Sequence, residues 1–311
     1  MSRHSLQSPW IHGAVLGLLA AAGAAQAVEN GAPITPFGVF DFGSGMLPPP
    51  TEVATVGLRT AFYRASQLRD DAGQRSPVGL KLKVDSIGVA LVKMTDISVL
   101  GGKYGAYAVL PYLNMSNRLS IPTPVGPLNL AGSDSAQGDI QIAPLVLQWT
   151  PSPGLFANAA LQLQLPTGSY DKNRLITAGT NHWTITPNAA VTYILPSGFE
   201  LSSTFQLNFN GRNKDTDYRS GVEYQQEFAL GQHVGPWTFG VGGYVYQQLT
   251  DDKRAGQDIG NRSRVMALGP VINFFELGSG WPLVWVHAYK EFNARNRAQG
   301  THAALRAAWS F

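Results

Sequence analysis

The chain has 311 residues, a formal net charge of +3, 34 glycines, 20 prolines and only 14% charged residues. Because no dense run of Lys or Arg accompanies this weak positive charge, nucleic acid is not expected as a partner. The chain has no cysteine, which excludes a disulfide-stapled secreted domain and a zinc-thiolate site.

The first 27 residues have the pattern of a secretory signal peptide. A basic start at Arg3 and His4 precedes an apolar run over residues 11–25, and residues 25–27 (Ala-Gln-Ala) form a small-x-small cleavage site. After this segment no stretch approaches the roughly 18 to 20 uninterrupted apolar residues that a membrane-spanning helix requires. We therefore expect an exported protein with a cleaved signal peptide, and not a helical membrane protein.

Residues 28–53, called the N-terminal segment, come before any strand pattern. Their five prolines and four glycines exclude a regular helix and disfavour a hydrogen-bonded strand. The segment also carries apolar side chains at Phe37, Phe40, Phe42 and Met46. This apolar density is higher than a solvated spacer needs, so we expect the segment to pack against a partner surface.

From residue 54 onward, apolar and polar side chains alternate with the period of two that is typical of strands. The predicted strands span residues 54–65, 85–99, 104–114, 138–149, 155–166, 183–195, 199–210, 220–231, 237–249, 263–275, 282–292 and 301–311. This makes about twelve strands, an even number, as single-chain bacterial outer membrane barrels require.

The connections between the predicted strands alternate between short and long. The short ones are almost uncharged and rich in Gly and Pro, at residues 101–102, 151–154, 196–198, 235–236 and 278–280. The long ones are polar and include residues 69–73, 171–174, 212–217 and 251–254. An antiparallel barrel with short periplasmic turns, long outer loops and both termini in the periplasm predicts this alternation, whereas a soluble sandwich does not.

The last strand supports the same interpretation. Trp309 and Phe311 share an apolar face, while His302 and Arg306 lie on the opposite face. Closing strands of outer membrane barrels end on an aromatic residue that the barrel-assembly machinery recognises, and this resemblance implies that machinery as a partner. The edge strand of a secreted β-sandwich is the alternative.

We therefore predict an all-β fold, a transmembrane antiparallel β-barrel of about 12 strands at residues 54–311 in the lipid of the bacterial outer membrane. The N-terminal segment is expected to fold into the periplasmic mouth as a plug and to form part of an apolar ligand site; an ordered arm packed beneath the barrel is the alternative. The candidate residues for the ligand site and the lining of the lumen are Phe37, Phe40, Phe42, Met46, Arg59, Tyr63, Gln162, Gln164, Gln206, Glu223, Glu227, Tyr244 and Tyr246. Structural hydrogen-bond and ion-pair networks are the alternative role for the polar members of this set.

Several stretches resemble the meta-pathway phenol-degradation family of outer membrane proteins. They are residues 31–50, 165–171, 180–183, 217–221, 235–244, 250–252 and 260–262. The resemblance covers most of the chain after the signal peptide. It implies a transporter-like barrel linked with the uptake of aromatic or other hydrophobic compounds, in a family that includes a sphingosine-induced member.

We therefore expect an outer membrane channel or transporter for a hydrophobic or aromatic small molecule, without cofactor, metal or catalytic residues. A structural or adhesion barrel that does not transport is the alternative. A lipolytic barrel enzyme is the third hypothesis, and it needs a serine activated by a histidine. None of His182, His233, His287 and His302 sits in a His-x-Ser arrangement, so we predict a protein that is not an enzyme.

Overall fold

The computed structural model describes residues 29, 36–276 and 280–309. The predicted signal peptide, residues 28 and 30–35 of the N-terminal segment, part of the predicted turn at 278–280 and the terminal Phe311 lie outside the described residues. In the described ranges, no helix has the length and apolar character of a membrane span.

Strands account for most of the described chain. They are β1 (Thr55–Arg69), β2 (Gly79–Val99), β3 (Gly102–Ile121), β4 (Leu128–Gln137), β5 (Gln141–Ser152), β6 (Leu155–Gln164), β7 (Thr184–Ile194), β8 (Phe199–Asn210), β9 (Tyr218–Arg219), β10 (Glu223–Val234), β11 (Trp237–Gln248), β12 (Asp252–Arg254), β13 (Gln257–Gly260), β14 (Arg264–Phe274), β15 (Leu283–Arg295) and β16 (Arg297–Trp309).

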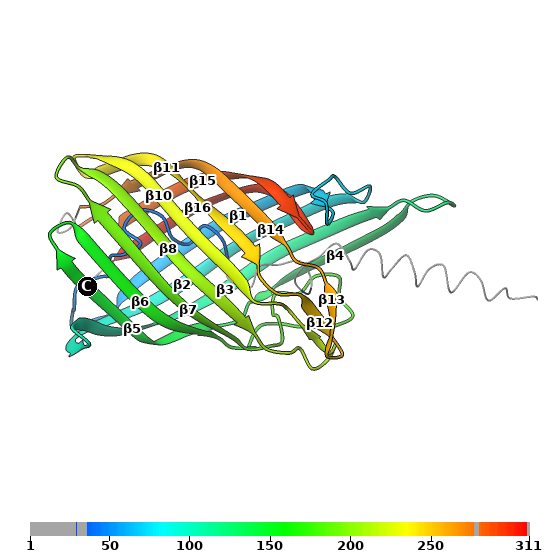
Figure 1. The fold of residues 1–311 in the computed structure, drawn as a ribbon, viewed down its shortest axis with the longest axis horizontal. Helices are drawn as coiled ribbons and strands as arrows, with labels where there is room; N and C mark the ends of the chain where they lie inside the picture. Colours follow the sequence, from blue (N-terminus) through cyan, green and yellow to red (C-terminus); the bar gives the residue numbers. More distant parts are fainter. Residues whose placement is uncertain (1–28, 30–35, 277–279, 310–311) are drawn as a thin grey trace, which may run out of the picture.

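Twelve of these strands form one closed antiparallel barrel, in the order β1, β2, β3, β5, β6, β7, β8, β10, β11, β14, β15 and β16 (Figure 1). The first and last strands close the ring, with a register that runs from Val56 opposite Trp309 to Arg69 opposite Arg297. The predicted all-β, twelve-stranded antiparallel barrel is thereby confirmed. Most strand bounds agree with the prediction to within a few residues.

Alternation along each strand separates two faces of the barrel wall. On β8, Leu201 and Phe205 are about 40% exposed and point outward, whereas Ser202 and Gln206 are almost completely buried. Other strands repeat this pattern, so that large apolar side chains surround the barrel. An apolar outer band around a polar interior suits a bilayer, because lipid covers the band that water would otherwise contact.

Two strands, β2 and β3, extend beyond the rim of the barrel, and β3 pairs there with β4, which lies outside the ring. We call this extension the flange, and it comprises residues 79–85 of β2, residues 112–121 of β3, and β4 (Figure 1). Leu80 and Leu119 lie in a buried apolar cluster on its inner face, whereas Lys81 and Arg118 are exposed on its outer face. The apolar side chains of the flange thus point inward, the reverse of the arrangement in the membrane band.

The flange corrects the predicted bounds of two strands. The prediction began β2 at residue 85 and ended β3 at residue 114, and it placed β4 in a loop, all of which is wrong. A second correction concerns the polar loops after β8 and β11, where β9, β12 and β13 form a separate three-stranded sheet. Both features lie at the end of the barrel opposite the short turns (Figure 1). Short turns mark the periplasmic end of such barrels, so we expect the flange and the small sheet to lie on the extracellular side.

Candidate lumen site

The inner face of the barrel wall carries polar side chains that are nevertheless buried. Glu223 and Glu227 on β10 are at most 1% exposed, and Glu200 on β8 is 2% exposed. Burying a carboxylate is costly unless hydrogen bonds compensate for the lost water. The groups that satisfy these carboxylates therefore define the site, and several of them come from the N-terminal segment.

Glu227 receives two backbone N–H groups of the N-terminal segment. Gly38 N donates to Glu227 Oε1 at 2.9 Å, and Phe40 N donates to the second oxygen of the same carboxylate. Glu200 plays a similar part, because Gly43 N donates to its Oε1 at 2.7 Å. The segment is too rich in Pro and Gly to form a ladder, and these wall carboxylates satisfy donors that a ladder would have paired.

The same pattern continues along the neighbouring strands. Gly45 N donates to Thr192 Oγ1 on β7 at 2.9 Å, and Leu47 N donates to Gln148 Oε1 on β5 at 2.9 Å. Residues 38–47 therefore follow the inner wall from β10 across β8 and β7 to β5.

Asp41 anchors the segment to the opposite part of the wall. Arg306 Nη2 on β16 lies 2.6 Å from Asp41 Oδ1, and His287 Nδ1 on β15 lies 3.1 Å from Asp41 Oδ2. His302 on β16 lies against His287, with 3.3 Å between His302 Nδ1 and His287 Nε2. Asp41 is 2% exposed, so this is a buried cluster of one carboxylate, one guanidinium and two imidazoles.

Aromatic contacts hold the start of the described segment. The Phe37 ring stacks on Tyr244 with 4.6 Å between ring centroids and meets Tyr246 edge-on at 5.2 Å. The Arg297 guanidinium lies 4.9 Å from the Phe37 ring centroid, a cation–π contact. Arg59 Nη2 donates to the Phe37 carbonyl oxygen at 2.9 Å.

The structure brings part of the predicted site together. The predicted wall residues that contact the N-terminal segment are Arg59, Glu227, Tyr244 and Tyr246. The predicted wall residues with neither a hydrogen bond nor a ring contact to the described segment are Tyr63, Gln162, Gln164, Gln206 and Glu223. Within the segment, Phe37 and Phe42 are buried, while Phe40 and Met46 are half-buried.

Most of the remaining wall residues form hydrogen bonds with other residues of the wall. Glu223 accepts from Tyr246 Oη at 2.8 Å and from Asn208 Nδ2 at 3.0 Å. Gln206 is different, because neither of its two amide heteroatoms has a hydrogen-bond partner among the described residues. A buried amide in this state is unusual, since most buried polar groups are satisfied by protein or water.

Sequence reasoning missed Asp41 of the segment and several wall residues that bind the segment, chiefly Glu200, His287 and Trp285. Trp285 Nε1 donates to the carbonyl oxygen of Phe42 at 2.9 Å. The alternation of β15 would have placed His287 and Trp285 on one inner face, because they are two residues apart. No sequence pattern indicates that Asp41 faces this pair, since that contact joins positions almost 250 residues apart.

Glu29 also belongs to the N-terminal segment, but it contacts a different part of the barrel. Its Oε2 accepts a hydrogen bond from Asn213 Nδ2, in the connection between β8 and β9, at 2.8 Å. This places Glu29 at the outer-loop end, whereas the sequence predicts that both ends of the chain after cleavage lie at the periplasmic end.

The arrangement is suited to binding by hydrogen bonds and ring contacts. Among the described residues, no group of three or more His, Asp or Glu side chains is placed to hold a metal ion. The polar side chains of the wall bind the backbone of the N-terminal segment, and the tyrosine rings of the wall contact the Phe37 ring. The arrangement can therefore hold an apolar or aromatic group next to fixed donors and acceptors.

Comparison with known proteins relates the chain to outer membrane barrels. Residues 65–307 match the family described as "Putative MetA-pathway of phenol degradation". The COG4313 outer membrane channel from Pseudomonas putida F1 superposes with a TM-score of 0.70 at 15% identity, over 90% of this chain and 100% of that chain. The transport unit of the autotransporter AIDA-I from Escherichia coli gives 0.47 at 10% identity, over 95% and 97% of the two chains. Curated proteins gave no match.

Proposed function

We propose that this chain, which belongs to the family described as "Putative MetA-pathway of phenol degradation", is an outer membrane channel for hydrophobic or aromatic small molecules. The observation that carries the proposal is the set of contacts between the N-terminal segment and the inner wall. They reach side chains of β1, β5, β7, β8, β10, β15 and β16. A segment held on so many sides narrows the lumen, so a wide pore for hydrophilic solutes is disfavoured.

The chemistry of the wall supports a permeant with a ring and a polar group. The segment inserts Phe37 between Tyr244 and Arg297, which is the environment an aromatic guest would need. Unpaired amide atoms of Gln206 and Gln162 lie on β8 and β6 and can bond to a hydroxyl group. A phenol offers both parts, a ring and a hydroxyl.

The channel from Pseudomonas putida F1, whose fold this barrel shares, is described as an outer membrane channel, which agrees with this proposal. The segment acts as the gate in our proposal. The contacts of the segment with the wall are hydrogen bonds, ion pairs and ring contacts without a covalent link, so they can be exchanged for contacts with a guest. Each is worth about 1 kcal/mol net, and contacts to charged groups somewhat more.

Deletion of residues 31–50 behind an intact signal peptide tests the proposal. We expect the variant to show higher ion conductance in planar bilayers and to lose saturable binding of phenols and alkylbenzenes. Uptake of phenols, alkylbenzenes and long-chain amines should fall in cells that carry the deletion, compared with complemented cells. A hydrophilic sugar serves as the control solute, and its entry should rise.

The mobility of unheated protein on a denaturing gel must first establish that the deletion variant forms a folded barrel. A folded variant with unchanged conductance and unchanged ligand binding would contradict the gate. A folded variant with raised conductance but unchanged binding would show that the segment restricts the lumen but does not form part of the ligand site.

A further inference from the structure

The flange presents charged side chains on the outer face of the wall, the face that carries the apolar band nearer the middle of the barrel. On β2, Ile87 and Val89 are exposed members of the outward apolar band. Residues two apart on a strand share a face, so Lys83 and Lys81 continue that outward row beyond the band. No bulge interrupts the pairing of β2 with β3 between Leu80 and Ile87, so each side chain of β2 keeps to its face over this stretch.

Two further cations join this row from the neighbouring strands. Arg64 on β1 follows the outward, exposed Phe62 by two residues. Arg64 is the cross-strand partner of Lys83, and Lys81 is the cross-strand partner of Arg118 on β3. We call Arg64, Lys81, Lys83 and Arg118 the basic patch.

The basic patch is not neutralised by the part of the chain that the structure describes. Asp85 forms an ion pair with Arg64. Lys81, Lys83 and Arg118 have neither an ion pair nor a side-chain hydrogen bond with any described residue. Four cations and one carboxylate leave a net charge of +3 on one small surface. Like charges directly opposite each other on adjacent strands are destabilising, so this surface favours a bound anion.

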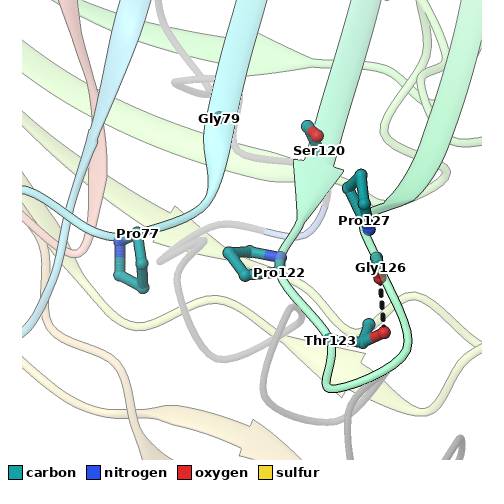
Figure 2. Close-up of a pocket in the computed structure, with 7 residues that line it drawn as sticks. All are labelled: Pro77, Gly79, Ser120, Pro122, Thr123, Gly126 and Pro127. Carbon is teal, nitrogen blue, oxygen red and sulfur yellow. Dashed lines mark hydrogen bonds between the residues drawn. The ribbon is translucent and has the colours of Figure 1, made fainter.

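Two hollows lie beside the basic patch. The first, of about 330 Å³, is lined by the start of β2 and the turn between β3 and β4, including Pro77 and Pro122 (Figure 2). The second, of about 390 Å³, shares Gly79 with the first and is lined by Lys81 and Arg118. Both volumes lie in the range of about 300 to 1,000 Å³ that small-molecule sites occupy.

We propose that the basic patch binds the phosphate groups of the glycolipid of the outer leaflet, and that the adjoining hollows take its sugar. The location favours a lipid over a soluble anion, because the cations continue a lipid-facing row immediately beyond the apolar band. Charge complementarity supplies the attraction, and Arg118 can bind a phosphate through two parallel hydrogen bonds. The site is independent of the lumen and of the proposed transport.

Binding of purified lipid A to the full-length barrel in detergent tests this proposal. The variant replaces Lys81, Lys83 and Arg118 by Gln, and the matched control replaces Lys172, Arg212 and Lys214, three exposed cations of the outer loops. Each cation near an anionic lipid surface contributes about a fivefold gain in affinity. We therefore expect the patch variant to bind bisphosphorylated lipid A about 100-fold more weakly, and the control variant to bind within about twofold of the wild type.

Two further arms identify the ligand. In the first arm, dephosphorylated lipid A should bind the wild type as weakly as bisphosphorylated lipid A binds the patch variant. In the second arm, millimolar inorganic phosphate should not displace lipid A that is bound to the wild type. A Lys81→Arg, Lys83→Arg variant keeps the charge and should retain binding of lipid A. It tests the role of the charge even if the patch variant fails to fold. Equal binding of dephosphorylated lipid, equal losses in patch and control variants, or displacement by free phosphate would each overturn the proposal.

Discussion

Gly38 is a residue at which the N-terminal segment lies close against the wall. Its φ of +64° lies in the left-handed region, where a side chain is strained. A Cβ at this position would lie 2.6 Å from His302 Cε1 and 2.7 Å from His287 Nε2. Only glycine allows the segment to lie against the two imidazoles while its N–H reaches Glu227.

We predict that Gly38→Ala loosens the segment from the wall. The backbone strain costs about 1 to 2 kcal/mol, and the collision with the imidazoles adds to it. Hydrogen exchange of the peptide that contains residues 36–47 should become faster in the purified barrel, and ion conductance should rise.

Gly43→Ala is the matched control for this substitution. Gly43 also has a positive φ, +72°, but the atom nearest to its added Cβ is Met46 Sδ at 3.9 Å. The control therefore carries the backbone strain without the collision, and its exchange should be slower than that of Gly38→Ala. Equal exchange in the two variants would show that the contact with the imidazoles does not hold the segment.

At the residue scale, the sequence indicates which side chains line the wall better than it indicates what they touch. Period-two alternation is enough to place Glu223, Glu227 and Tyr244 on the inner face of their strands. It carries no information on whether a carboxylate meets a tyrosine, as Glu223 does, or the backbone of the N-terminal segment, as Glu227 does. Those choices depend on the path of an irregular segment that has no periodic pattern.

At the scale of a single strand, the depth of a lipid-facing position decides the cost of a charge. We predict that Val241→Arg, on the outward face in the middle of β11, destabilises the barrel by about 2 to 4 kcal/mol. Gln247→Arg lies on the same face of the same strand near its outer end and should cost only about 0 to 1 kcal/mol. Urea unfolding in lipid vesicles measures both, and equal costs would mean that the band does not lie in the bilayer.

The three-stranded outer sheet is expected to respond to pH through Asp252. This carboxylate is buried and accepts hydrogen bonds from Gly221 N at 2.8 Å and Gln248 Nε2 at 2.7 Å. Burial raises the pKa of Asp252 to about 6, although these hydrogen bonds act in the opposite direction. Because the pKa is higher in the folded sheet, its stability is greatest below the unfolded value of 3.8 and falls as the pH rises through about 6.

The loss between pH 4 and pH 8 should reach about 3 kcal/mol at most, because one pKa unit corresponds to about 1.36 kcal/mol. Proteolysis of the loop between β11 and β14, corrected for the activity of the protease at each pH, measures the local opening. Cleavage should become faster toward pH 8 in the wild type. Asp252→Asn should lose most of this pH dependence, and a variant that keeps it would assign the effect to another group.

Strand positions in the membrane band follow from the sequence, whereas the flange does not. In the band, exposed apolar residues such as Val89 alternate with small or polar inner residues, and turn signals separate the strands. In the flange, alternation continues at Leu80, Lys81, Leu82 and Lys83, but the apolar side chains face inward. A search for strands with an apolar outer face therefore stops at the rim, where water replaces lipid as the outer neighbour.

For the whole molecule, ring closure was predictable because it follows from an even strand number and from alternating connection lengths. The position of the N-terminal segment was harder to predict from the sequence. Its apolar residues indicate that it needs a partner surface, but its course along β10, β8, β7 and β5 depends on contacts between positions about 100 to 190 residues apart. Only the folded barrel brings those partners to one place.

The orientation of the barrel in the membrane gives the last prediction. The chain contains no cysteine, so a single introduced thiol can be labelled without background. Lys214 lies in the connection between β8 and β9, at the outer end, and Ser197 lies in the turn between β7 and β8, at the other end; both are exposed. A membrane-impermeant maleimide on intact cells should label Lys214→Cys but not Ser197→Cys, because an intact outer membrane keeps the reagent out of the periplasm. Both should react once the cells are broken, which shows that each thiol is accessible. Labelling of Ser197→Cys alone on intact cells would invert the barrel, and the basic patch would then face the inner leaflet.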